Sequence, residues 1–168
     1  IVIGLRRLVK QKYQAVNTLW QIYKIVKFSK VFKQTLLIEV SRFIPCMTVK
    51  NYICRKWLNM KVGSYTSFAY KVMLDLFYPK LISVGNNTVV GYNTTILTHE
   101  VLGNEWRLGK VKIGSHTLIG ANTTILPGIT IGNHVKIGAG TVISTDVPDN
   151  SFAFGNPIQI KLHSGGDN

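Results

Sequence analysis

The sequence predicts a mainly β protein in which a solenoid of short strands follows a basic, helical N-terminal segment. Two observations support this: an aliphatic residue recurs at every sixth position late in the chain, and the net positive charge lies almost wholly in residues 1–61. A helix would repeat apolar residues every three or four positions and an ordinary strand every second one, so a strict period of six indicates a coil with similar corners. The recurring residues are Ile113, Ile119, Ile125, Ile131, Ile137 and Ile143.

The N-terminal segment, residues 1–61, holds thirteen Lys and Arg against the single acid Glu39, a net charge of +12, whereas residues 62–168 hold seven against six, a net +1. Apolar and basic residues alternate in a pattern that favours helices. Basic residues also interrupt every apolar run well before the roughly 18 residues needed to cross a bilayer, so no transmembrane helix is predicted. The apolar positions are Leu5, Leu8, Val16, Leu19, Trp20, Tyr23, Val26 and Val31.

A basic amphipathic segment can have four roles. It can bind an anionic membrane surface or lipid-linked acceptor, pack against the protein or another subunit, bind an anionic glycan, or bind nucleic acid, and the first of these is favoured. No nucleic-acid motif is present, so no such partner is expected. Cys46 and Cys54 have no metal or redox spacing, which predicts free buried thiols in a reducing compartment. No secretory signal is visible. We therefore expect a cytoplasmic protein. Peripheral contact with the inner membrane surface is a second expectation, which follows from the favoured role of the basic segment.

Each repeat of six carries its own corner and a second inward residue. The residue three places after each aliphatic tolerates a left-handed backbone, and the residue four places after it is β-branched, which suits a half-buried strand. The corner positions are His116, Asn122, Gly128, His134, Gly140 and Asp146. The second inward positions are Thr117, Thr123, Ile129, Val135, Thr141 and Val147.

The same pattern runs from Val84 to His99 and, faintly, from Val62 to Ser67. Ile96 and Ile113 are seventeen apart, which is not a multiple of six, so residues 100–110 should leave the coil as a loop. Loops ejected from rigid repeats commonly carry function. At 168 residues we expect one main domain at 62–161, the helical segment before it and a flexible tail at 162–168.

The repeats, together with three further stretches, resemble the hexapeptide-repeat acyltransferases, and among them the maltose and galactoside O-acetyltransferases. These stretches are Leu126–Gly132, the exit Ile143–Pro148 and the closing Gly155-Asn156-Pro157. The resemblance covers residues 80–161. It implies a left-handed parallel β-helix with three repeats per coil, a homotrimer with active sites between subunits, and acetyl-CoA as donor.

His99 is the predicted catalytic residue. Acyl transfer to an alcohol needs a base, and imidazole titrates near working pH. The resemblance makes His99 that general base, because Thr98-His99 stands where related enzymes carry their catalytic His. The residues alone also fit a corner role, since His99 lies three after Ile96, as His116 and His134 do in their repeats. The latter two should stack one coil apart, and because no third ligand has a suitable spacing, no metal is expected.

Other residues are assigned to the acceptor. Glu100 follows His99 where the sugar enzymes carry Pro, and would orient the imidazolium, bind the acceptor or be a solvated carboxylate. An Asn that those enzymes carry about thirty residues upstream is missing, which leaves Ser67 and Tyr70 as weak substitutes and puts the sugar acceptor in doubt. Trp106, in the ejected loop, would cover the donor or a neighbouring subunit, or act as a packing anchor.

For the donor, the resemblance points to small residues after Ile-Gly pairs, where the pantetheine arm approaches the backbone. The expected donor residues are Ala121, Ala139, Ser144, Thr145 and Lys161. Two positions depart from the family, which often has Lys at Thr145 and a basic residue at Gln159.

These observations predict a CoA-dependent O-acyltransferase that moves an acetyl group to a hydroxyl of a sugar, glycan or glycolipid by direct attack. Two alternatives stay open. One is N-acetylation of an amino sugar, and the other is a β-helix scaffold that has lost catalysis, which the missing Asn and Lys would explain.

Overall fold

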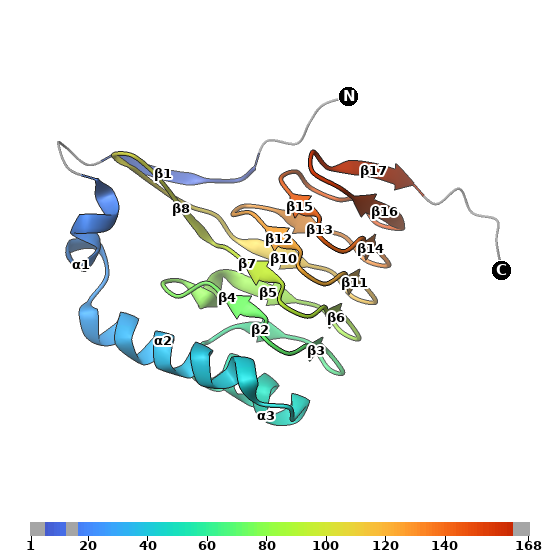
Figure 1. The fold of residues 1–168 in the computed structure, drawn as a ribbon, viewed down its shortest axis with the longest axis horizontal. Coiled ribbons are helices and arrows are strands. Elements are labelled where there is room, and N and C mark those ends of the chain that lie inside the picture. Colours follow the sequence, from blue (N-terminus) through green and yellow to red (C-terminus); the bar gives the residue numbers. More distant parts are fainter. Residues whose placement is uncertain (1–5, 13–16, 163–168) are drawn as a thin grey trace.

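The protein is a parallel β-helix whose first coil is covered by helices (Figure 1). The computed structural model describes residues 6–12 and 17–162. Expectations for Leu5, Val16 and residues 163–168 of the tail lie outside these residues, whereas Leu162, the first residue of the predicted tail, ends a strand. The predicted fold class, mainly β with a helical N-terminal segment, is confirmed.

Three sheets run the length of the coil, and between residues 61 and 143 the strands of the coil belong to the first, second and third sheet in turn. The first sheet contains β2 (Lys61–Val62), β5 (Ile82–Val84), β10 (Val111–Ile113) and β13 (Thr130–Ile131). The second contains β3 (Ser67–Phe68), β6 (Val89–Val90), β11 (Leu118–Ile119), β14 (Lys136–Ile137), β16 (Ser151–Phe154) and β17 (Gln159–Leu162). The third contains β4 (Met73–Leu74), β7 (Thr95–Ile96), β12 (Thr124–Ile125) and β15 (Val142–Ile143).

Strand register confirms a coil of three repeats. Ile113 pairs with Ile131, and Ile119 with Ile137, each eighteen residues on. All six recurring isoleucines are at most 3% exposed, and the β-branched positions four residues later are buried beside them. The inward threonines satisfy their hydroxyls with corner carbonyls, as in the hydrogen bond from Thr123 Oγ1 to Gly120 O at 2.7 Å.

The corners are named here by the sheets they join: corner 1 joins the first and second sheets, corner 2 the second and third, and corner 3 the third and first. Five of the six predicted corner residues have a left-handed backbone, namely His116, Asn122, Gly128, His134 and Gly140. His116 and His134 stack as expected, with ring centroids 4.9 Å apart.

One corner prediction, Asp146, is wrong, and the corner role considered as an alternative for His99 is not observed; both residues lie at corner 3. Asp146 does not have a left-handed backbone. Its side chain instead accepts the Thr130 N–H at 2.7 Å, as the coil ends. His99 is not a left-handed corner residue either, because it begins a strand, β8 (His99–Leu102).

The ejected segment is not an irregular loop. It forms a hairpin of β8 and β9 (Glu105–Leu108), whose turn includes Gly103 at φ +56°. β1 (Val9–Lys12) adds to β9 as a third, antiparallel strand, so residues 9–12 are not helical as predicted. All four residues of β1 are exposed and show no apolar periodicity, so the open edge of β9 rather than the local sequence selects the strand.

The remaining N-terminal elements are short except for one helix. They are η1 (Thr18–Gln21), α1 (Ile22–Ile25), α2 (Phe28–Phe43), α3 (Met47–Tyr52) and a π-helical turn η2 (Ile53–Trp57), while a 3-10 turn η3 (Pro79–Leu81) precedes β5. Figure 1 shows α2 and α3 lying across the end of the coil where β2, β3 and β4 begin the stack. None of the helices in the described ranges is long and apolar enough to cross a membrane.

Basic and amide side chains of α3 and η2 cap the first coil. This coil has no earlier coil beside it, so carbonyls that point away from the stack lack strand partners, and buried carbonyls need donors. Lys50 donates to Phe68 O and Ala69 O at 2.9 and 3.2 Å, Asn51 to Thr66 O at 2.7 Å, and Arg55 to Val62 O and Gly63 O at 2.8 and 2.7 Å. Part of the N-terminal positive charge is therefore structural.

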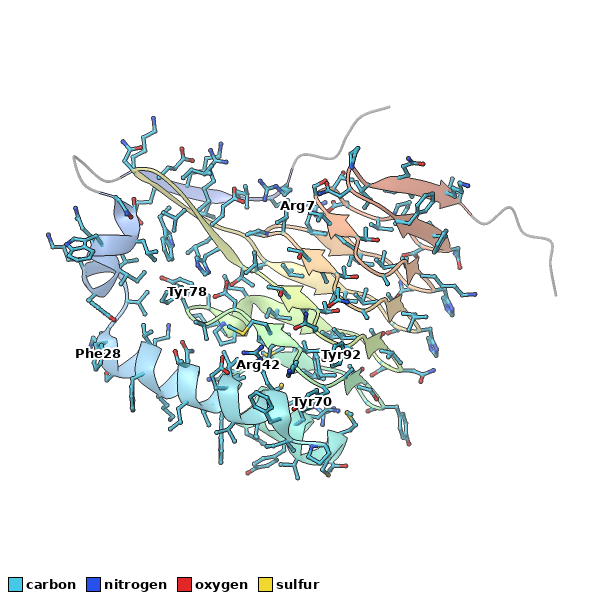
Figure 2. The ribbon with its side chains drawn as sticks, in the orientation of Figure 1. Arg7, Phe28, Arg42, Tyr70, Tyr78 and Tyr92 are labelled. Atoms are coloured by element: carbon cyan, nitrogen blue, oxygen red, sulfur yellow. The ribbon has the colours of Figure 1, made fainter. Side chains whose placement is uncertain are left out.

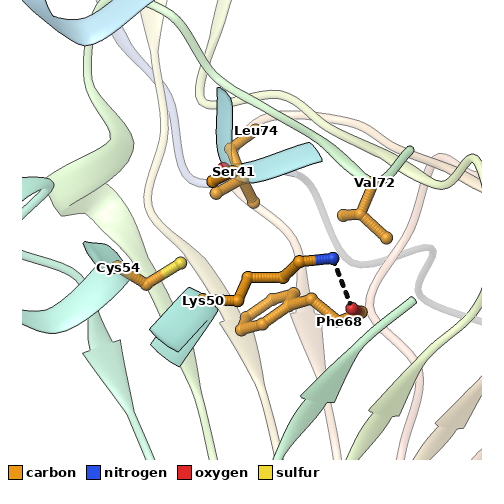
Figure 3. A pocket seen from close by; sticks show the side chains of 6 residues that line it. All are labelled: Ser41, Lys50, Cys54, Phe68, Val72 and Leu74. Carbon is orange, nitrogen blue, oxygen red and sulfur yellow. Dashed lines mark hydrogen bonds between the residues drawn. The ribbon is translucent and has the colours of Figure 1, made fainter. Parts of the chain in front are cut away.

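Lys50 lines a small pocket together with Ser41, Cys54, Phe68, Val72 and Leu74 (Figure 3). Burial lowers the pKa of the Lys50 ammonium, although the nearby Cys54 acts in the opposite direction. Burial also raises the pKa of the Cys54 thiol to about 12, so the thiol is neutral at physiological pH. Both cysteines are free, but Cys46 is exposed, contrary to the expectation that both are buried.

Candidate active site

The site is at corner 3, where the chain twice leaves the regular coil. The first departure follows β4 and includes Asp75, Phe77 and Tyr78; the second, one coil later, is the β8–β9 hairpin with His99 and Trp106. Because the two departures leave neighbouring coils at the same corner, their side chains meet. Figure 2 labels Tyr78 in this region, away from Tyr70 and Tyr92.

Asp75 holds the imidazole of His99. Asp75 Oδ2 lies 2.5 Å from His99 Nδ1 and accepts the backbone N–H groups of Thr98 at 2.8 Å and His99 at 3.1 Å. Its other oxygen accepts the N–H groups of Phe77 and Tyr78, both at 2.9 Å. The Asp75 side chain has no exposed surface, whereas that of His99 is 17% exposed. The carboxylate is thus fixed by five donors.

The surroundings of Asp75 favour its ionised form. Burial alone would raise its pKa, but the hydrogen bond and charge of His99 and the backbone N–H groups of Thr98 and Tyr78 outweigh burial and hold the pKa below its ordinary value. An ionised carboxylate accepts a proton-bearing Nδ1, so the neutral imidazole keeps Nε2 as its acceptor. Nε2 has no hydrogen bond to any residue that the structure describes.

Aromatic rings fix the imidazole plane. The indole of Trp106 stacks on it at 4.9 Å and 16°, and Phe77 meets it edge-on at 4.7 Å. Trp106 is 1% exposed and packs with Ile22 of α1 and Val26, which tie the N-terminal segment to the hairpin. In this structure Trp106 is a packing anchor beside His99; a contact with substrate stays a prediction.

Glu100 does not contact the imidazole. Successive residues of a strand point to opposite faces, so Glu100 lies on the other side of the hairpin from His99. There it pairs with Arg6 at 2.7 Å and with Arg107 at 3.3 Å, and its side chain is 19% exposed. The contact with the imidazole that was considered for Glu100 is made by Asp75, and the Glu100 carboxylate is paired with two guanidinium groups rather than free in solvent. Acceptor binding by Glu100 stays a prediction.

The two weak acceptor candidates lie away from His99 within one chain. Ser67 is in β3 of the second sheet, and Tyr70 is at corner 2, where its ring lies 5.6 Å from that of Phe43 and stacks on Tyr92 at 6.1 Å (Figure 2). The structure does not bring Ser67 or Tyr70 to corner 3.

The donor candidates lie at two corners and on β17. Ala121 and Ala139 lie one coil apart at corner 2, where Ala121 O accepts the Gly140 N–H at 2.8 Å. Lys161 is exposed on β17, 5.3 Å from the Phe154 ring. Ser144 is exposed and Thr145 half-buried, both after β15 at corner 3. Their roles in donor binding stay predictions.

No group of three or more His, Cys, Asp or Glu that could hold a metal ion occurs among residues 6–12 and 17–162. Beside the stacked His116–His134 pair at corner 1, Asn87 Nδ2 lies 3.1 Å from His116 Nδ1. This pair lies at a different corner from His99.

Asp75 is the residue that the sequence interpretation missed. A signal was available: continuing the faint repeat from Val62 by steps of six reaches Phe68 and Leu74, and Asp75 then occupies the position that Gly takes in most other repeats. A carboxyl group in place of that Gly, one coil before His99, marks it as unusual.

Comparison with known proteins agrees with this fold. The family model described as "Bacterial transferase hexapeptide (six repeats)" matches residues 110–145. The chain is 58% identical over 158 residues to the candidate acetyltransferase SAR0816 of Staphylococcus aureus (strain MRSA252), covering 94% of this chain and 98% of that protein.

Two solved structures share the fold. A maltose O-acetyltransferase from Clostridium difficile 630 aligns with a TM-score of 0.62 at 24% identity, over 81% of this chain and 88% of that one. The hexapeptide-repeat acetyltransferase VCA0836 from Vibrio cholerae, complexed with acetyl coenzyme A, aligns with a TM-score of 0.66 at 20% identity, over 83% and 88%. Because the staphylococcal relative matches almost end to end, this chain belongs to the hexapeptide-repeat acetyltransferases.

Proposed function

We propose that this protein transfers an acetyl group from acetyl-CoA to a hydroxyl of a sugar, glycan or glycolipid, with His99 as general base. The observation that carries the proposal is the Asp75–His99 pair, in which a fully buried carboxylate fixes Nδ1 at 2.5 Å and leaves Nε2 as the basic nitrogen. Burying a charge is costly because the charge loses its water, and a scaffold without catalysis has no need for a buried carboxylate held by five donors.

The reaction follows from this arrangement. His99 Nε2 removes the hydroxyl proton of the acceptor as its oxygen attacks the thioester carbonyl carbon. Asp75 stabilises the imidazolium that forms and keeps the proton on Nδ1, as in other acid–base pairs that combine a carboxylate with His. The tetrahedral intermediate then collapses, the C–S bond breaks, and the imidazolium returns its proton to the thiolate of CoA. The products are an acetyl ester and free CoA.

The donor assignment is supported by the acetyl-CoA complex of the Vibrio neighbour and by small residues at corner 2. A Cβ at Gly120 would lie 2.6 Å from Ala139 N, which shows how closely the coils stack there. The side chains of Ala121 and Ala139 are small, so an extended pantetheine arm can approach the backbone groups beside them. We assign Ser144, Thr145 and Lys161 to the distal part of the donor.

A homotrimer would complete the site. In one chain His99 lies at corner 3, whereas Ala121 and Ala139 lie at corner 2, across the third sheet. Packing corner 3 of one copy against corner 2 of the next would bring base and donor together, and three copies would close the ring. Closed rings of this kind follow from a head-to-tail contact.

The test is an acceptor screen that follows CoA release from acetyl-CoA with wild-type protein and His99→Ala, using simple sugars, amino sugars, glycolipids and cell-wall glycans. Treating the product with hydroxylamine separates esters, which it cleaves, from amides, which it leaves. We expect an ester that forms only with wild-type protein. An amide product would replace the proposal with N-acetylation, and absence of turnover with every acceptor would favour the scaffold.

A further inference from the structure

The outward face of α2 is apolar although it faces solvent. Five large side chains, which we call the α2 stripe, are more than half exposed: Phe28 at 61%, Phe32 at 62%, Leu36 at 56%, Val40 at 52% and Phe43 at 51%. Contiguous exposed apolar surface of this kind on a soluble protein marks an interaction site.

Helix geometry confirms that the stripe forms one face. With 3.6 residues per turn, positions three or four apart share a side, as the stripe residues do. The opposite side carries the two buried residues of the helix, Ile38 and Ser41, and packs on the first coil. α2 is therefore apolar both toward the core and away from it. Packing on the core accounts for the apolar residues on the inner face, but not for the apolar stripe on the outer face.

Aromatic residues before α2 extend the stripe. Trp20 is 84% exposed and Tyr23 is 58% exposed. The Tyr23 ring meets that of Phe28 at 5.4 Å, and Phe28 stacks on Phe32 at 6.2 Å, so the rings form one continuous surface. Trp and Tyr favour the boundary between water and lipid because one end of each is apolar and the other polar.

The charges beside the stripe are positive. Lys24, Lys27 and Lys33 are exposed there, and none forms a salt bridge with another described residue. Glu39 is the only acid in residues 1–61, and it is paired with Arg42 at 2.9 Å. Unlike Lys50 and Arg55, which cap carbonyls of the first coil, these lysines donate no side-chain hydrogen bond to a residue in the described part of the chain.

We propose that the α2 stripe, with its flanking lysines, binds the surface of an anionic lipid bilayer. The helix would lie in the interface with its apolar side chains among the acyl chains and its lysines against the headgroups, as amphipathic helices do. The proposal is independent of the acetyl-transfer chemistry. It concerns the end of the coil at β2, β3 and β4, whereas His99 lies farther along the stack (Figure 1).

Two observations favour a membrane over a second copy of the chain on this face. Self-association through the same face would place lysines against lysines with no free acid to receive them. The stripe also occupies the end of the solenoid, so copies that associate side by side would present their stripes in one plane, which fits a flat surface (Figure 1).

Cosedimentation tests the proposal, with vesicles of phosphatidylcholine alone and of phosphatidylcholine mixed with phosphatidylglycerol. We expect binding to the anionic vesicles at least tenfold stronger than to the neutral ones, and release by salt. Lys24→Glu with Lys27→Glu should weaken binding by roughly 30-fold or more, since each lysine near the surface contributes about fivefold. Lys110→Glu with Lys136→Glu is the charge-matched control, because both residues are exposed on the coil.

Phe32→Ser with Leu36→Ser tests the apolar contribution, and we expect binding to weaken by at least about tenfold. The matched control is Leu118→Ser with Leu162→Ser, which removes side chains that are 47% and 70% exposed elsewhere. Because all four residues are exposed, melting temperatures should stay close to wild type.

Equal binding to both vesicle types would overturn the proposal, as would stripe variants that bind like their controls. Light scattering covers the alternative occupant. If Phe32→Ser with Leu36→Ser lowers the oligomer mass while the control pair does not, the stripe is an interface between copies and the membrane proposal fails.

Discussion

Replacing Asp75 with Asn tests the acid–base pair at its centre. The substitution keeps the volume of the side chain but removes its charge, and one of its two terminal atoms becomes an N–H donor. In the wild type both Asp75 oxygens act as acceptors. Oδ2 accepts from His99 Nδ1 and two backbone N–H groups, and Oδ1 accepts from two other backbone N–H groups. In either orientation the amide NH2 of the variant side chain would face two backbone donors.

The expected loss follows from this geometry. At an effective dielectric constant of about 20, charges about 4 Å apart interact by about 4 kcal/mol, and each 1.4 kcal/mol or so is a factor of about ten in rate. Loss of the Asp75 charge thus costs up to about 1,000-fold in stabilisation of the imidazolium. If the amide NH2 faces Nδ1, the tautomer also reverses and the loss reaches about 10,000-fold. We therefore expect kcat to fall roughly 100-fold to 10,000-fold.

Stability should change too. Two buried N–H groups left without an acceptor cost about 1 to 3 kcal/mol each, so Asp75→Asn should melt at a lower temperature. Because the folded pKa of Asp75 is lowered, its ionised form stabilises the wild type above the ordinary pKa of 3.8, and this contribution declines as pH falls through the folded value. The Asn variant should lack that part of the acid-induced loss.

The assay is CoA release at saturating acetyl-CoA, at a temperature where circular dichroism shows the variant to be folded. The KM for acetyl-CoA should change little, because Asp75 acts on the base and not on the donor. A folded Asp75→Asn enzyme with kcat within about threefold of wild type would refute the pair as the source of catalysis.

Three further predictions concern the surrounding structure. Trp106→Ala should lower the free energy of unfolding by about 3 to 5 kcal/mol in thermal unfolding, because it removes the side chain that packs the hairpin against the N-terminal segment. Trp106→Phe should cost less, since the indole Nε1 has no hydrogen-bond partner among the described residues. Glu100→Gln should leave kcat within about tenfold of wild type, because Glu100 lies on the far side of the hairpin. Light scattering should give about three times the 18.8 kDa chain mass, and an active monomer would remove the proposed site between copies.

The repeat pattern predicts the coil well because each of its signals is local. A buried aliphatic, a residue that tolerates positive φ and a β-branched residue recur in order, so Ile119, Asn122 and Thr123 define one repeat almost by themselves. The phase break after Ile96 locates the hairpin for the same reason, since an insertion is visible wherever the period fails.

The parts that could not be predicted depend on contacts between distant segments. β1 is a strand because β9 offers an unpaired edge, and its own residues Val9–Lys12 show no preference that reveals it. The repeat marks Asp75 as an unusual residue, but its contact with His99, 24 residues further on, could not be predicted, because it depends on two insertions that leave adjacent coils at one corner. Lys50 and Arg55 likewise cap carbonyls of the first coil that lie 18 and 7 residues further along the chain, a role that their local sequence does not indicate.

The central claim is that His99 is the general base, and the turnover of His99→Ala tests it most directly. Acetyl-CoA affinity, measured by calorimetry on the same preparation, should change little, while kcat falls roughly 100-fold to 10,000-fold. His116→Asn and His134→Asn serve as matched controls, because these residues stack at corner 1 and should leave kcat near wild type. Near wild-type turnover by a folded His99→Ala protein would contradict the account.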